Sequence, residues 1–248
     1  MGSLRAEFGK LRRSLSWAVV VLLPLTAIVS GTATTLASGA ALAQGWHTLW
    51  LRVVVFHGLF PLAAGIAVLA SLVWRVEHRG SNWNALMGRS TSSLGVVAGK
   101  AAVLAALVAA MQVVLVAGTV LAGKTAFGLP GFLPARYLLV SVLVVLACLP
   151  VAALQSALSM LMRSFAAPVA VALLGAAASV GLLMTAGGGA VVVPYALLTR
   201  TTQLGTGTFA DTGPVTAGVV AVLVVASVVL TAAVVAVSAA VLDRRDIG

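Results

Sequence analysis

The chain has 248 residues, of which 61% are hydrophobic and only 8% are charged, and its mean hydropathy is +1.16. A soluble domain carries about 25% charged and roughly 45–50% apolar residues, so this composition excludes a water-soluble enzyme and predicts an integral membrane protein. The formal net charge of +10 would indicate nucleic-acid binding in a soluble protein. Here the cations sort by membrane side, as described below, and we expect no nucleic-acid partner.

Six apolar runs are near the length that a membrane-spanning helix requires, which is about 20 residues for a hydrocarbon core of roughly 30 Å. Lipid cannot hydrogen-bond backbone polar groups, so a chain that does not close into a barrel crosses the membrane as a helix, which forms these bonds internally. The sequence therefore predicts one all-α membrane domain with six transmembrane helices. The predicted spans are residues 17–36, 51–74, 101–122, 137–161, 168–185 and 215–242.

The basic residues are distributed unevenly between the two sides that these spans define. If the N-terminus is inside, eleven of the 15 Lys and Arg residues fall in cytoplasmic segments. The cytoplasmic residues are Arg5, Lys10, Arg12, Arg13, Arg75, Arg79, Arg89, Lys100, Arg163, Arg244 and Arg245, and the external ones are Arg52, Lys124, Arg136 and Arg200. The positive-inside rule therefore predicts cytoplasmic N- and C-termini.

Residues 1–16 differ from the spans, because their apolar residues recur at helical spacing among cations. The apolar positions are Leu4, Phe8, Leu11 and Leu15. This pattern predicts an amphipathic interfacial helix in the inner headgroup plane, with its cations toward anionic lipid. A disordered basic tail that only sets the topology is the alternative.

Residues 186–214 form the least regular segment. Three glycines at 187–189 precede a short apolar run, 190–198, which contains Pro194 and is too short to cross the membrane. A re-entrant or interfacial helix and a plain external loop are both compatible with this pattern, since irregular backbone at membrane depth needs cover from protein or water.

Residues 118–125 read GTVLAGKT and match the phosphate-binding pattern GxxxxGK[ST]. A phosphate-binding loop requires a strand before it and a helix after it, so that backbone amides cradle the phosphates. Here the glycines end a predicted span and Lys124 faces the outside. We therefore reject a nucleotide site at these residues.

The sequence contains no other catalytic or metal-binding pattern. The acids are Glu7, Glu77, Asp211, Asp243 and Asp246, and none lies inside a span. Cys148 is the only cysteine, so there is no disulfide framework and no cysteine-ligated metal. His78 is predicted on the opposite side from His47 and His57. We expect no catalytic residue and no metal site in this chain.

Three polar side chains lie at depth inside predicted spans: His57, Gln112 and Gln155. Polar groups at depth commonly hydrogen-bond neighbouring helices. Contact with a substrate along a pathway between the helices is the alternative for each of them.

The cytoplasmic loop of residues 75–100 carries Trp83, Leu86 and Met87 among charged residues, at spacings of three and four. Apolar anchors surrounded by polar residues are typical of a docking surface. A short helix lying against lipid would show the same pattern and remains an alternative.

At this loop the sequence resembles a known family, the permease subunits of type-2 ABC exporters, particularly the lantibiotic immunity and bacitracin-type branch. Those permeases carry an acid and a lysine before the first span, matched here by Glu7 and Lys10. After the second span they carry a glutamate, an asparagine and tryptophan, a leucine, and a lysine that opens the third span. The matching residues here are Glu77, Asn82, Trp83, Leu86 and Lys100.

The resemblance implies a multi-pass protein of a bacterial inner or plasma membrane, with residues 1–16 as an interfacial helix. It also implies that residues 75–90 form a coupling helix that docks into a separate ATPase. The docking residues would be Glu77, His78, Arg79, Asn82, Trp83, Leu86 and Met87. The pump would contain two permease chains, identical or sister chains, and two ATPase chains, and ATP and Mg would bind the ATPase.

These observations predict a non-catalytic permease subunit of an ATP-driven ABC exporter, which moves a peptide, lipid-like or amphiphilic molecule outward. One alternative is a membrane scaffold whose loop docks a signalling partner. A secondary transporter is the other, and it is disfavoured by the lack of an intramembrane carboxylate and of visible internal repeats.

Overall fold

The computed structural model describes residues 9, 14–39, 41–78, 92–207 and 215–244, and every regular element within them is a helix. This agrees with the predicted all-α architecture. In chain order the elements are α2 (Ser16–Ala37), α3 (Trp46–Leu59), α4 (Pro61–Arg75), α6 (Ser93–Thr125), α7 (Ala135–Leu161), α8 (Ala166–Ala186), the 3-10 helix η1 (Gly187–Val192), α9 (Pro194–Thr202) and α10 (Ala217–Asp243).

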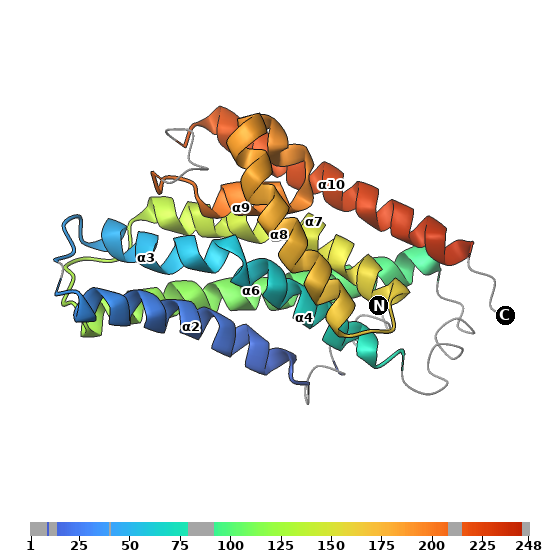
Figure 1. The fold of residues 1–248 in the computed structure, drawn as a ribbon, viewed down its shortest axis with the longest axis horizontal. Helices are drawn as coiled ribbons and strands as arrows, with labels where there is room; N and C mark the ends of the chain where they lie inside the picture. The colour runs from blue at the N-terminus through green and yellow to red at the C-terminus, as the bar shows by residue number, and fades with distance from the viewer. Residues whose placement is uncertain (1–8, 10–13, 40, 79–91, 208–214, 245–248) are drawn as a thin grey trace.

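The long helices form an elongated bundle with α2 and α10 at opposite margins (Figure 1). α7 is the most buried of the long helices, and α10 is the least buried. At one end of the bundle, on the right in Figure 1, α2, α6 and α8 begin and α4, α7 and α10 end. We call this the loop end, because α4 ends and α6 begins there.

Five helical segments are long and apolar enough to cross a membrane, and the α3–α4 pair passes the same test as a bent sixth. The segments include α2, α6, α7 and α10, together with α8 extended through η1 to Val192. The chain thus carries five to six candidate spans by length and composition, as the apolar runs predicted.

Helix α6 is longer than the span predicted from its apolar run. Its 33 residues extend about 50 Å at 1.5 Å per residue, whereas the hydrocarbon core is roughly 30 Å thick. The helix begins at Ser93 because the Ser92 side chain accepts a hydrogen bond from the Gly95 amide, 3.2 Å away, and so caps the first turn. The first two turns therefore carry the helix past the apolar run to the loop end.

The second predicted span is a broken helix pair. α3 and α4 meet at an angle of 50°, and Pro61 is the first residue of α4. Proline has no amide hydrogen to donate and its ring crowds the preceding turn, so a continuous helix through this position is disfavoured. Pro24 and Pro150, by contrast, lie inside α2 and α7 without dividing them.

The segment between the last two spans contains helices, where the sequence left a re-entrant helix and a plain loop open. η1 and α9 follow α8, and Gly187 takes a positive φ of 53° where α8 ends. The residues of α9 from Tyr195 to Thr202 are all buried. A short helix covered on all sides by protein is a form in which non-spanning backbone is tolerated at membrane depth.

Close approach of α3 to α9 requires a glycine at position 58. A Cβ at Gly58 would overlap the side chain of Thr202, including its Cβ, which cannot move without the α9 backbone. Gly99 in α6 offers a comparison, since a Cβ there would have no heavy atom within 4 Å.

We predict that Gly58→Ala lowers the free energy of unfolding by about 1–3 kcal/mol, because it overpacks the α3–α9 contact. Gly99→Ala, a helical glycine in open space, should leave stability unchanged or raise it slightly. Thermal unfolding of the purified chain in detergent measures both changes. Equal stability of the two variants would contradict the close α3–α9 packing.

Several predicted residues lie outside the described ranges. In the predicted interfacial helix, Leu4, Phe8 and Leu11 are among them, whereas Leu15 is described and exposed at the start of α2. In the predicted coupling helix, the residues outside the description are Arg79, Asn82, Trp83, Leu86 and Met87. Both helices therefore remain predictions from the sequence.

Candidate functional site

The candidate site is the base of the segment that joins α4 to α6, where two residues of the sequence motif meet. The Lys100 ammonium lies 2.8 Å from a Glu77 carboxylate oxygen, and the two side chains are only 1% and 4% exposed. Lys100 also donates to the Val73 carbonyl at 3.3 Å. Glu77 and Lys100 are 23 residues apart in sequence, so this ion pair closes the loop between them at its base.

Local backbone geometry places Glu77 for this contact. Its amide donates to the Trp74 carbonyl at 2.9 Å, and the His78 amide donates to the same carbonyl at 3.2 Å. These bonds continue the turn of α4 past Arg75, so Glu77 faces the first turns of α6. Lys100 lies there because the capped start at Ser92 extends α6 beyond its apolar run.

The Trp74 side chain extends this contact to a third helix. The Lys100 ammonium lies 5.2 Å from the Trp74 ring centroid, a distance at which a cation is attracted to an aromatic face. The Trp74 indole in turn donates to the Ser156 hydroxyl of α7 at 2.8 Å. Because both partners are buried, the bond fixes the end of α4 against α7.

Further contacts join α7 and α10 to the same base. His78 Nε2 donates to the Ser159 carbonyl of α7 at 2.7 Å. Trp74, Met160 and Leu242 share a buried apolar cluster with two valines of α6, Val96 and Val97. The end of α4 and the start of α6 are therefore joined to α7 and α10 by one set of contacts. We call this set of contacts the loop foot.

Removal of one partner of the Glu77–Lys100 ion pair is expected to lower the stability of the fold. A buried charge whose partner is removed keeps its desolvation penalty without the compensating attraction, which typically destabilises a protein by about 3–5 kcal/mol. Loss of either partner of the Glu77–Lys100 pair is therefore expected to destabilise the loop foot strongly.

We predict that Glu77→Gln destabilises the chain by about 3–5 kcal/mol, because it leaves the buried Lys100 ammonium without its counter-charge. Asp243→Asn is the matched control, since Asp243 is an exposed acid at the same end of the bundle. Thermal unfolding in detergent gives both values. A midpoint for Glu77→Gln equal to that of Asp243→Asn would show that the pair contributes nothing.

A second polar cluster surrounds the buried helix α9. Gln155 of α7 donates to the Tyr195 hydroxyl, and Ser179 of α8 shares a hydrogen bond with Thr199 at 3.0 Å. Arg200 donates to the Gly188 carbonyl at 3.1 Å. These bonds tie α9 to α7, α8 and η1, so Gln155 joins helices as polar residues at depth commonly do.

His57 and Gln112 lack such partners among the residues that the structure describes. His57 is 1% exposed and neither ring nitrogen has a hydrogen bond, and the Gln112 amide nitrogen is also buried without an acceptor. No hydrogen bond or ring contact joins His57, Gln112 and Gln155 to one another in the described part of the chain. Buried polar atoms without partners are uncommon. Thr32, Trp50 and the Gln155 side-chain oxygen share this property in the described part of the chain, so His57 and Gln112 are two of several buried polar side chains that a substrate could contact.

The phosphate-binding pattern of residues 118–125 forms the last turns of α6. Thr119 donates to the Leu115 carbonyl within the helix at 2.7 Å. Lys124 donates to the Leu129 carbonyl at 3.0 Å and lies 5.9 Å from the Trp46 ring centroid. The amides of this stretch are used by the helix, so these residues form no phosphate cradle, in agreement with their sequence context.

The sequence missed most of the polar residues around α9. Residues 199–203 read TRTTQ and belong to segment 186–214, for which the sequence left a re-entrant helix and an external loop open. Their burial depends on the packing of α7 and α8, which local sequence does not record. The sequence did identify two residues of the loop foot, since Glu77 and Lys100 belong to the motif that carried the resemblance.

Fold and site together define a polytopic helical membrane protein with a tightly anchored loop and a buried polar helix between its last two spans. A family model described as ABC-2 family transporter protein matches residues 3–179. The chain belongs to this family, and it is therefore a permease-type membrane component of an ABC transporter, for which the family implies an ABC ATPase partner. No curated protein and no solved structure matches the chain.

Proposed function

We propose that the chain is the permease subunit of an ATP-driven exporter of the lantibiotic immunity and bacitracin-type branch, and that it moves a peptide, lipid-like or other amphiphilic molecule outward. Family membership supports the transporter class. The branch rests on the resemblance at Glu7, Lys10 and the motif between Glu77 and Lys100.

The loop foot is the observation that carries this proposal. A separate ATPase docked on residues 75–90 would act on a segment whose base is bonded to α4, α6 and α7. Closure of the ATPase around nucleotide would therefore shift three helices together, and the spans would move between inward- and outward-facing arrangements. ATP and Mg would be bound by the ATPase, and none by this chain.

The distribution of cations supports an orientation with the loop end in the cytoplasm. Among the described residues, four cations lie at or near the loop end (Arg75, Lys100, Arg163 and Arg244) and four lie elsewhere (Arg52, Lys124, Arg136 and Arg200). The excess comes from seven cations that adjoin the loop end in sequence, Arg5, Lys10, Arg12, Arg13, Arg79, Arg89 and Arg245. The positive-inside rule favours this end as the cytoplasmic one. The ATPase would then meet the loop on the side where ATP is available.

The substrate path would run between two permease chains, identical or sister, and would include His57 and Gln112. The unpartnered polar atoms of these two residues support the assignment, because a polar substrate group or water would supply the missing hydrogen bonds. Gln155, which is bonded to Tyr195, would act in the same region through the position of α9.

We predict that Trp83→Ala reduces recovery of the ATPase with the tagged permease at least about tenfold, because an aromatic anchor at an interface contributes on the order of 2 kcal/mol or more. Trp17→Ala is the matched control: Trp17 is a partly exposed tryptophan at the start of α2 on the same end of the bundle. Purification in mild detergent, with quantification of the ATPase and of its ATP turnover, measures the effect.

Recovery of the ATPase with Trp83→Ala at the level of Trp17→Ala would contradict docking through this loop. Recovery of the wild-type chain without any ATPase, in several detergents, would favour a membrane scaffold or a secondary transporter. Equal amounts of each permease variant in the membrane fraction establish that insertion is intact.

A further inference from the structure

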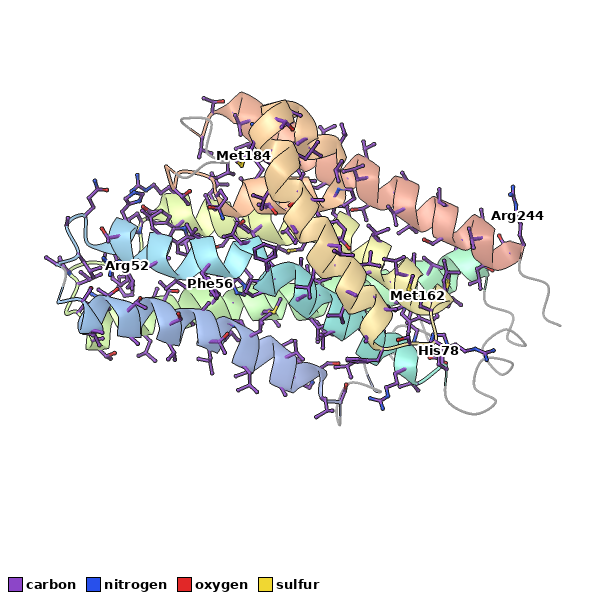
Figure 2. The ribbon with its side chains drawn as sticks, viewed as in Figure 1. Arg52, Phe56, His78, Met162, Met184 and Arg244 are labelled. Carbon is purple, nitrogen blue, oxygen red and sulfur yellow. The ribbon has the colours of Figure 1, made fainter. Side chains whose placement is uncertain are left out.

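A cavity of about 370 Å³ opens at the loop end between α4, α7 and the start of α8. Ser71, Arg75, His78, Ser159, Arg163 and Phe165 are among its lining residues. Arg75, Arg163 and Phe165 are exposed, whereas Ser71 and Ser159 are buried. The cavity therefore reaches from the surface to two buried hydroxyl groups. Figure 2 shows His78 and Met162, which both line it, at the same end of the bundle as Arg244.

Neither arginine of the cavity is paired with an acidic side chain in the described part of the chain. Among the residues that the structure describes, the only ion pair joins Glu77 to Lys100. The Arg75 guanidinium lies 5.9 Å from the Phe165 ring centroid. Stacking on an aromatic face leaves the N–H groups at the guanidinium edge available, and those groups match the oxygens of a phosphate in a two-point contact.

The cavity walls supply further hydrogen-bonding capacity and a positive potential. The Ser71 hydroxyl lies 3.4 Å from both the Ser159 hydroxyl and the Phe165 carbonyl, at the outer limit of a hydrogen bond. The 21-residue helix α8 begins at Ala166, next to Arg163 and Phe165. A helix N-terminus adds a partial positive charge that favours an anion.

The position of the cavity distinguishes a lipid from a free ion. It lies where α4 and α7 end and α8 begins. The ends of membrane-spanning helices meet the phospholipid headgroups, so this position would place the cavity beside them. Its exposed rim includes Phe165, and the adjacent Leu161 is also exposed. A ligand with a phosphate joined to an apolar chain would satisfy the arginines and this rim together.

We propose that this cavity binds the phosphate of an anionic phospholipid headgroup, held by Arg75 and Arg163. The site rests on the membrane placement of the bundle, and Arg75 and His78 at its edge also belong to the segment proposed to dock the ATPase. The test uses the permease alone, so its failure leaves the proposed exporter function untouched, and failure of ATPase docking leaves the lipid site untouched.

The experiment measures the thermal midpoint of the purified chain in detergent against increasing short-chain phosphatidylglycerol, phosphatidylcholine or sodium phosphate. A ligand that binds only the folded state raises this midpoint in a saturable way. We expect a saturable rise with phosphatidylglycerol and a much weaker response to phosphatidylcholine, whose choline cation opposes the arginines. We expect sodium phosphate alone to give little rise.

The double variant Arg75→Gln with Arg163→Gln should bind phosphatidylglycerol at least about tenfold more weakly, because two charge-assisted contacts are lost. Arg244→Gln is the matched control, as an exposed arginine at the same end that does not line the cavity. Arg75→Lys with Arg163→Lys, which keeps the charge and removes the two-point contact, should be intermediate. Native mass spectrometry of retained phosphatidylglycerol provides a second readout.

Equal binding by the double glutamine variant and by Arg244→Gln would overturn the site. A saturating rise with sodium phosphate that phosphatidylglycerol does not exceed would overturn the lipid assignment in favour of a free phosphate ion. Equal affinity for phosphatidylglycerol and phosphatidylcholine would also overturn it, since the proposed site selects for negative charge.

Discussion

The buried ion pair between Glu77 and Lys100 is the constraint on which the loop end of the molecule depends. Because both charges are removed from water, each requires the other, and the end of α4 cannot separate from α6 without exposing or orphaning a charge. Trp74 lies against the same ammonium and bonds to Ser156, so α7 is held as well. A docked partner would thus act on a single connected body rather than on a free loop.

The opposite half of the bundle is held together by a different kind of polar contact. There the buried helix α9 is held by hydrogen bonds, such as those that Gln155 and Ser179 make with Tyr195 and Thr199. The bend at Pro61 separates the two regions, because it divides the second span into α3, which packs on α9, and α4, which ends in the loop foot. A break of this kind is one place where a displacement at the loop end can change the packing around α9.

The sequence predicted the spans well because the thickness of a bilayer dictates the length of an apolar run, and that length is local information. It named Glu77 and Lys100 as motif residues without predicting that they meet, since a contact across 23 residues depends on how α4 and α6 pack. It left α9 open between a re-entrant helix and an external loop, because the burial that distinguishes the two depends on how α9 packs against other helices. The cavity between Arg75 and Arg163 likewise joins residues from distant helices.

Transmission from the ATPase to the spans through the Glu77–Lys100 pair can be tested directly by a distance between spin labels at Phe132 and Met184. The distance is measured in the assembled permease–ATPase complex with and without trapped nucleotide. Both positions are exposed and lie away from the loop foot: Met184 is labelled in Figure 2, and Phe132 lies between the end of α6 and the start of α7. Cys148 is buried, so introduced cysteines label selectively. We expect a nucleotide-dependent change in the wild-type chain that is lost in Glu77→Gln, with the two chains compared only in folded complexes that retain the ATPase. The same change in both chains would contradict transmission through the Glu77–Lys100 pair.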